Sequence, residues 1–525
     1  MKHADVLSGL AANASLPPEL VDRLIELAVA DTDADFTDDL AKRPDLTHAQ
    51  ALALYARVPE SGPQLACEGR LTVADVDPAA DPDTALALLG EGRGDPVWGR
   101  VLVADPDFWR RQRLARCVGL PPDVVETLAA GPDVRVVGEL ALWTTDRALA
   151  TRLAGHPNAE VRKYAAWNEA TPPAVLAALL DDKGLPPVQR CSVCGVEETG
   201  CEVWAYDVCG GTHETAVHDV RHGALSNPAT PIEAVIPFAD DPSELLRRAL
   251  AERSDLPPEV SRRLATDPDV HVRACLAEHP DLPLEVSRRL ATDPDVHIRA
   301  CIAEKPAGDD ALMRVLAEDE YQDVRRRLAH NPNVPLDVLV RLIAATKIGP
   351  TLLPRVEAAS PAEVGKLAHS ADSTVRMLVA LRRDLPAEIR DALATDPDAK
   401  VLKSIAPHPG LSEARLRAMV DRHGVQVLAA VAANPDASGA LLEHLAHDCP
   451  PVHQAFREIA AHPHATPRAL LACLTDGQAR PIAAGHPALP PQVIVELLAD
   501  DDGHVAKAAA GNASLPGAVM RNLVP

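Results

Sequence analysis

The chain has 525 residues and a formal net charge of −24, and its hydrophobic content of 47% includes only 2% aromatic residues. Binding to phosphate groups requires clustered Lys and Arg, so this balance argues against a nucleic-acid-binding or anionic-membrane protein. The sequence has no run of eighteen apolar residues and no charged-then-apolar start, so we expect neither a transmembrane helix nor a signal peptide. Ten scattered cysteines in such a chain favour reduced thiols and a cytoplasmic location.

The first segment, 1–119, has the pattern of degenerate helical repeats. The five residues from Asn13 to Pro17 read as the junction between two repeats, and the same five residues recur from Asn512 to Pro516. We therefore expect the chain to begin near the end of one repeat and to stop inside the first helix of another. This leaves no room for a separate terminal domain.

The rhythm becomes regular over 120–182, where repeats begin at Leu120, Thr145 and Thr171. The next repeat begins at Thr230, which is 59 residues after Thr171. About 33 extra residues, 183–215, therefore lie between the two helices of one repeat. Regular repeats resume over 216–525, with the weakest stretch at 346–354, where Gly349-Pro350 indicates a local break.

Two nearly identical copies at 256–306 show the repeat most clearly, with an offset of 26 residues. Pro257 suits the first turn of a helix that ends at Asp267-Pro268, because proline restricts the residue before it. Asp269 can then cap a second short helix. Neither helix is long enough to be stable alone, whereas stacked neighbours bury a shared core. The fold class predicted is all-α, an α-solenoid (α-α superhelix) of two-helix repeats of about 24–28 residues with a small Cys-rich insert.

The segment LATDPDVHVRACLAEHP, Leu264 to Pro280, resembles the units of the leucine-rich repeat variant family. These units read approximately Leu-Ala-x-Asp-Pro-x-x-x-Val-Arg-x-x-Val-Ala-x-Asn-Pro, and Val324-Arg325 with Asn331-Pro332 is a second match. The resemblance covers most of the chain from Leu120 onward. It implies a right-handed superhelix of paired short helices without enzyme activity, and HEAT-like repeats are the close alternative.

The insert is the only stretch with the character of a metal site. Cys191 and Cys194 form a CxxC pair, and Cys201, Cys209 and His213 follow. One possible ligand set consists of Cys191, Cys194, Cys209 and His213. Its fourteen-residue loop between the two ligand pairs has a length that is usual for structural zinc. The other set consists of the four cysteines and suits either zinc or an iron–sulfur cluster.

Some proteins of the leucine-rich repeat variant family carry a four-cysteine [4Fe-4S] cluster domain ahead of the repeats. Here the cysteines interrupt a repeat instead, so we expect redox-inert zinc, with the [4Fe-4S] cluster as the alternative. The insert is acidic, whereas a nucleic-acid-binding zinc finger is normally basic.

Three further patterns have structural interpretations. Seven arginines share one register of the repeat, and nearby Asp residues favour an Asp–Arg ladder over a basic stripe for an acidic partner. These arginines are Arg162, Arg221, Arg247, Arg273, Arg299, Arg325 and Arg376. Cys275 and Cys301 occupy the small-residue register of Ala249 and are expected to be buried packing residues. His218 and His222 fall in a second helix, as ordinary repeat positions.

The function predicted is a non-enzymatic repeat scaffold that binds a protein or peptide partner and holds zinc in its central insert. The alternative is an iron–sulfur-containing redox or metal-sensing repeat protein. The sequence has no nucleophile elbow, phosphate loop or dinucleotide fingerprint.

Overall fold

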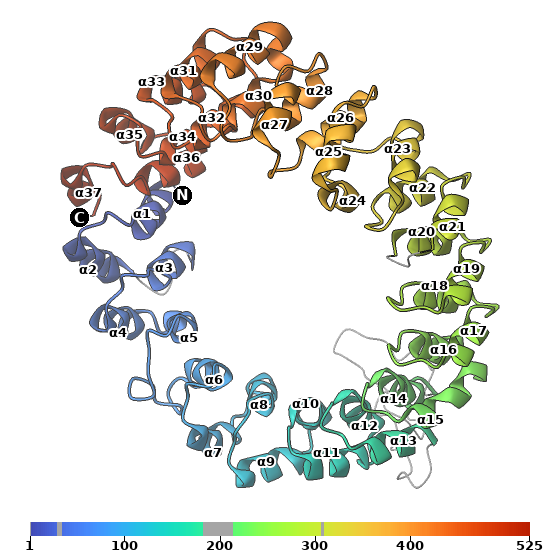
Figure 1. Ribbon diagram of the computed structural model, residues 1–525. Helices are drawn as coiled ribbons and strands as arrows, with labels where there is room; N and C mark the ends of the chain where they lie inside the picture. The colour runs from blue at the N-terminus through green and yellow to red at the C-terminus, as the bar shows by residue number, and fades with distance from the viewer. Residues whose placement is uncertain (1, 29–33, 182–213, 306–308, 525) are drawn as a thin grey trace. The chain divides into compact units, whose positions relative to one another are not determined.

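The computed structural model describes residues 2–28, 34–181, 214–305 and 309–524 (Figure 1). These residues form α-helices and short 3-10 helices joined by turns, and no strand occurs among them. The predicted all-α solenoid is therefore confirmed for the described chain.

The chain divides into two compact units. Unit 2 spans Thr72–Pro335. Its helices are α6 (Pro82–Gly90), η2 (Pro96–Trp98), α7 (Gly99–Leu102), α8 (Phe108–Ala115), α9 (Pro122–Ala129), α10 (Val134–Trp143), α11 (Arg147–Ala154), α12 (Ala159–Trp167), α13 (Pro173–Asp181), α14 (Glu214–Ser226), α15 (Ile232–Val235), η3 (Ile236–Asp240), α16 (Glu244–Ala251), α17 (Pro258–Leu264), α18 (Val270–Ala277), α19 (Leu284–Leu290), α20 (Val296–Glu304), α21 (Asp310–Leu316) and α22 (Gln322–Ala329).

Unit 1 combines Met1–Leu71 with Leu336–Pro525. Its helices are α1 (Lys2–Ala12), α2 (Pro18–Leu27), α3 (Ala34–Ala41), α4 (His48–Arg57), η1 (Pro59–Ser61), α5 (Gly62–Cys67), α23 (Leu336–Ala345), α24 (Pro354–Glu357), α25 (Pro361–Ala368), α26 (Ser373–Ala380), α27 (Ala387–Leu393), α28 (Ala399–Ile405), α29 (Glu413–His423), η4 (Gly424–Gln426), α30 (Leu428–Ala432), α31 (Gly439–His447), α32 (His453–Ala461), α33 (Pro467–Cys473), α34 (Arg480–Gly485), α35 (Pro491–Leu497), α36 (Gly503–Ala510) and α37 (Gly517–Leu523).

Each regular repeat places a first helix and a second helix in two separate layers. In unit 2 the second helices α16, α18, α20 and α22 pack in succession, and the first helices α17 and α19 pack on each other. In unit 1 the second helices α26, α28, α30, α32, α34 and α36 form the corresponding row. Helix caps set these boundaries: the Asp269 carboxylate accepts the backbone N–H of His271 at 2.8 Å at the start of α18, as predicted.

The core between the layers consists of aliphatic side chains in the predicted register. Val260, Leu264, Val272 and Leu276 are at most 3% exposed. Cys275 and Cys301 depart from expectation, because both are half-buried free thiols, whereas Ala249 in the same register is fully buried. Burial still raises the pKa of both thiols.

A second polar ladder, which the sequence analysis did not anticipate, connects the ends of successive second helices. Asn434 illustrates it: the side-chain amide donates to the carbonyl oxygens of Ala406 and, at 2.7 Å, of His408 in the preceding repeat. In other repeats Arg or His takes this position, as when Arg382 donates to the Val356 and Ala359 carbonyls. These bonds satisfy helix-end carbonyls that would otherwise be buried without a donor.

In unit 1 this ladder continues from the last helices of the chain to the first. Asn512 donates to the carbonyls of Ala484 and His486, and Asn13 donates in the same way to those of Ala510 and Asn512, both at 2.9 Å. Helix α1 packs on α36 as a second helix, next to the labelled chain ends in Figure 1. The N-terminal repeats therefore stack on the C-terminal repeats as if they came next in the sequence. We call the α1–α36 contact the terminal junction.

Candidate functional site

The five metal-ligand candidates of the insert, Cys191, Cys194, Cys201, Cys209 and His213, lie outside the described residues. The described flanks are α13, which ends at Asp181, and α14, which begins at Glu214 and packs against α13. Within the residues that the structure describes, no group of three or more His, Cys, Asp or Glu side chains could hold a metal ion.

The repeat stack continues across the insert. The side-chain amide of Asn227, after α14, donates to the Ala166 carbonyl at 2.9 Å and to the Asn168 carbonyl at 3.0 Å, although 59 residues separate the two asparagines. His222 in α14 packs against the Trp167 ring, with centroids 5.6 Å apart. His222 is therefore a packing residue of the repeat, as its register predicted.

Four of the seven recurring arginines form the predicted ladder with aspartates. Each of these four guanidiniums makes a two-pronged ion pair with an Asp 20 residues later, at Nε–Oδ2 distances of 2.7 or 2.8 Å, in the pairs Arg247–Asp267, Arg273–Asp293, Arg299–Asp319 and Arg376–Asp396. The Arg273 Nη1 also donates to the carbonyls of Asp267 and Pro268. The same side chain thus caps one turn and anchors the next repeat, which favours a structural role.

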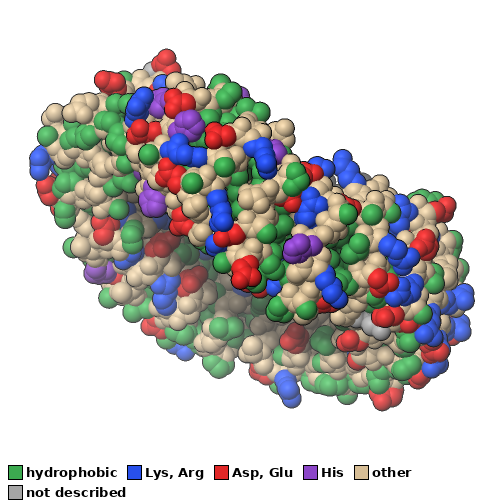
Figure 2. All heavy atoms as spheres, turned by 45° about the horizontal axis from the view of Figure 1, so that its top comes forward, with side chains coloured by type: hydrophobic (Ala, Val, Ile, Leu, Met, Phe, Trp, Pro, Cys, Tyr) green, Lys and Arg blue, Asp and Glu red, His purple; other side chains and the backbone are tan. Residues whose placement is uncertain are grey.

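The ladder also shifts the acidity of its aspartates. Burial by itself raises the pKa of Asp293, but the Arg273 pair and the backbone N–H of Asp295 together hold that pKa below its ordinary value. Asp293 therefore stays ionised in the fold, with a side chain only 6% exposed. On the face shown in Figure 2, Lys and Arg side chains are intermingled with Asp and Glu side chains.

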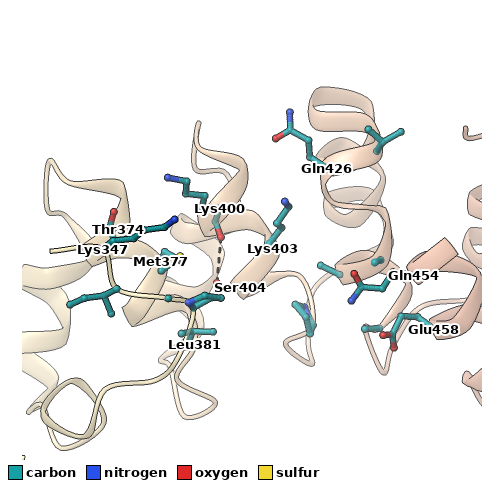
Figure 3. Close-up of a pocket in the computed structure, with 18 of the residues that line it drawn as sticks. Lys347, Thr374, Met377, Leu381, Lys400, Lys403, Ser404, Gln426, Gln454 and Glu458 are labelled. Carbon is teal, nitrogen blue, oxygen red and sulfur yellow. Dashed lines mark hydrogen bonds between the residues drawn. The ribbon is translucent and has the colours of Figure 1, made fainter. Parts of the chain in front are cut away.

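A groove in unit 1 has a volume of about 850 Å³. Successive second helices line it through Met377 in α26, Lys400 in α28, Ala430 in α30 and Glu458 in α32. The non-helical stretch between α23 and α24, which includes Lys347, lines it too. We call this site the basic groove; Figure 3 shows it with Lys347 and Glu458 on opposite sides of the view.

Positively charged side chains outnumber negatively charged ones in the lining of the basic groove. Four cationic side chains line it, Lys347, Arg383, Lys400 and Lys403, together with one carboxylate, Glu458. The Arg383 guanidinium donates to the Pro407 carbonyl at 3.0 Å. The local break at Gly349-Pro350 was the one feature of the sequence that pointed to this site. The sequence analysis did not predict that cationic side chains from different repeats come together here.

Two smaller pockets lie in unit 2 around exposed tryptophans. Trp143 and Trp167, which are 52% and 41% exposed, line a pocket of about 590 Å³ with Thr145 and Glu169. The Trp143 indole N–H donates to the Glu139 carboxylate at 3.1 Å. Trp143 also lines a neighbouring pocket of about 270 Å³.

No family model matches the chain, and no curated protein matches it either. One similar solved structure is described as a leucine-rich repeat variant with a novel repetitive structural motif; it is 21% identical, with 53% of this chain and 87% of that chain covered and a TM-score of 0.28. Two crystal structures of importin beta are also similar. The first is 12% identical, with 96% of this chain and 73% of that chain covered and a TM-score of 0.28. The second is 13% identical, with 95% of this chain and 81% of that chain covered and a TM-score of 0.27. The assignment as a helical repeat protein rests on this chain's own helices. No described helix is both long and apolar enough to cross a membrane.

Proposed function

We propose that this chain is a non-enzymatic repeat scaffold that binds a protein or peptide partner in the basic groove. The observation that carries the proposal is the groove itself, because about 850 Å³ lies within the usual range of ligand sites of about 300–1,000 Å³. Side chains from four successive repeats line it, so the solenoid presents one continuous surface to an extended ligand.

The chemistry of the groove supports binding over catalysis. Its lining contains no His and no Cys, and the Ser404 hydroxyl donates to the Lys400 carbonyl at 3.3 Å, the dashed line in Figure 3. An activated serine would instead donate to a general base. The lining therefore lacks the nucleophile–base pair that acyl transfer requires.

The insert is the second part of the proposal. We propose that it binds one structural zinc ion through Cys191, Cys194 and two of Cys201, Cys209 and His213, in a cytoplasmic protein. The support is the ligand spacing together with the shortness of the insert, which needs a cross-link to hold a fold. A [4Fe-4S] cluster and a redox or metal-sensing role are the alternative, and metal analysis with a visible spectrum of anaerobically purified protein separates the two.

A peptide display experiment on the full-length protein tests the binding function. Short random peptides are selected on the wild-type chain and then measured against Ala430→Trp, in which a bulky uncharged side chain fills the groove. Ala472→Trp is the matched control, because Ala472 is a half-buried alanine on the first helix α33. We expect the selected peptides to bind the control variant and to lose affinity for Ala430→Trp. Equal binding to both variants, or no selected peptide at all, would contradict the groove as the binding site.

A further inference from the structure

Resting on the proposed scaffold function, we infer that the basic groove takes an acidic peptide segment that also carries aliphatic side chains. The positive charge of the groove and its apolar floor together determine which partner chemistry fits.

The charge of the groove runs against that of the chain. The whole sequence has 76 acidic and 52 basic residues, whereas the groove lining has four basic side chains and one acidic side chain. Lys347, Lys400 and Lys403 are exposed, and none of them has an ion-pair partner within 4 Å among the described residues. The Lys400 ammonium lies near enough to Asp398 to help lower the pKa of that carboxyl.

This contrasts with the arginines of the ladder, whose guanidiniums are already neutralised by aspartates. The groove lysines therefore retain their attraction for a ligand carboxylate. In Figure 3, Lys400 and Lys403 extend from the same helix, α28. Because both are exposed, screening by salt limits each contact, and several acidic residues are needed for useful affinity.

The floor of the groove is apolar. Met377 and Ile348 are 6% and 8% exposed, and Val425 is 49% exposed at the rim. A methionine side chain adapts to differently shaped partners. Aliphatic ligand side chains would therefore be buried on this floor while neighbouring carboxylates meet the lysines.

A nucleic acid fits these observations less well. Proteins that bind single strands stack bases on aromatic side chains, and no aromatic residue lines the groove. The net charge of −24 also opposes a polyanion as long as a nucleic acid. An acidic peptide is short enough to be attracted by the groove alone.

Fluorescence anisotropy with full-length protein tests the inference directly. The probes are a fluorescein-labelled peptide of Glu and Leu, a matched peptide with Lys in place of Glu, and a third with Ser in place of Leu. We expect only the first to bind well, and we expect Lys400→Glu/Lys403→Glu to weaken it by about tenfold, since two attractive contacts become repulsive. Glu458→Lys changes the charge in the opposite direction and should tighten binding by about threefold.

The control variant is Lys366→Glu, which reverses an exposed lysine on the first helix α25, outside the groove. It should bind the Glu–Leu peptide like the wild type. If selected peptides depend on an open groove but are not acidic, the partner chemistry is wrong and the scaffold function stands. If no selected peptide depends on an open groove, both proposals fail. Binding of oligo-dT as tight as that of the Glu–Leu peptide, and equally sensitive to the charge reversals, would overturn the peptide in favour of a nucleic acid.

Discussion

The terminal junction gives the most specific prediction, at Gly9 in α1. A β-carbon added at Gly9 would meet the Lys507 carbonyl oxygen at less than contact distance and the Ala510 Cβ at 2.7 Å. Both groups belong to α36, and a backbone carbonyl cannot rotate away as a flexible side chain would. Gly9→Ala should therefore force α1 away from α36.

The magnitude follows from three contributions. Overpacking a close contact costs about 1–3 kcal/mol, and the alanine regains about 0.5–1 kcal/mol because it stabilises a helix relative to glycine. Separation also weakens the two buried hydrogen bonds from Asn13 to the Ala510 and Asn512 carbonyls, each contributing about 1 kcal/mol. We expect the junction to lose about 2 kcal/mol, equivalent to roughly thirtyfold in its opening equilibrium.

Amide hydrogen exchange measured by mass spectrometry checks this value. Exchange should accelerate by roughly thirtyfold in both α1 and α36, although they lie at opposite ends of the sequence, while α18 and α20 in unit 2 keep their rates. Gly365→Ala in α25 is the matched control, because nothing lies within 4 Å of its added β-carbon, and it should slow local exchange. Faster exchange in α1 with α36 unchanged would refute the junction.

Three further predictions concern the ladders and the insert. Arg273→Ala should lower the free energy of unfolding in urea by about 3 kcal/mol, because Asp293 becomes a buried, unpaired carboxylate, whereas Arg262→Ala, which removes an exposed pair with Glu285, should cost less than about 1 kcal/mol. Burial lowers the pKa of His408, so the stabilisation that the neutral imidazole contributes is present above pH about 6.5 and is lost as the pH falls below that value. His408→Asn should therefore reduce the fall in melting temperature between pH about 7.5 and pH about 5. Cys191→Ser should abolish binding of one zinc per chain, measured by metal analysis, while the far-ultraviolet circular dichroism of the repeats stays helical.

Each of these predictions has a clear contrary result. An Arg273→Ala chain that unfolds like the wild type but loses its partner would restore the basic-stripe interpretation. An unchanged pH dependence in His408→Asn would assign that dependence to other groups. A brown protein without zinc would replace the zinc ion with an iron–sulfur cluster, and four freely titrating thiols in the insert would exclude both.

Local patterns in the sequence were sufficient to predict the repeat, because the residues that define a repeat act within about one period. Pro257 and Asp269 set the helix starts through contacts with backbone groups only a few residues away. The apolar register of Leu264 and Leu276 likewise follows from helical spacing. The Asp–Arg ladder was predictable for the same reason, since the regular stacking of neighbours brings Arg273 to Asp293.

Only the tertiary structure decided the terminal junction and the basic groove. Asn13 and Ala510 are 497 residues apart, so their contact depends on how the repeats of unit 1 stack and not on any local preference. The groove gathers Lys347, Met377, Lys400 and Glu458 from different repeats. Only Lys347 lies in a stretch that departs from the regular repeat, and the other three occupy ordinary second-helix positions. A side chain's register within its own helix is set by local spacing, whereas the curvature that brings four second helices around one cavity is the sum of packing between repeats.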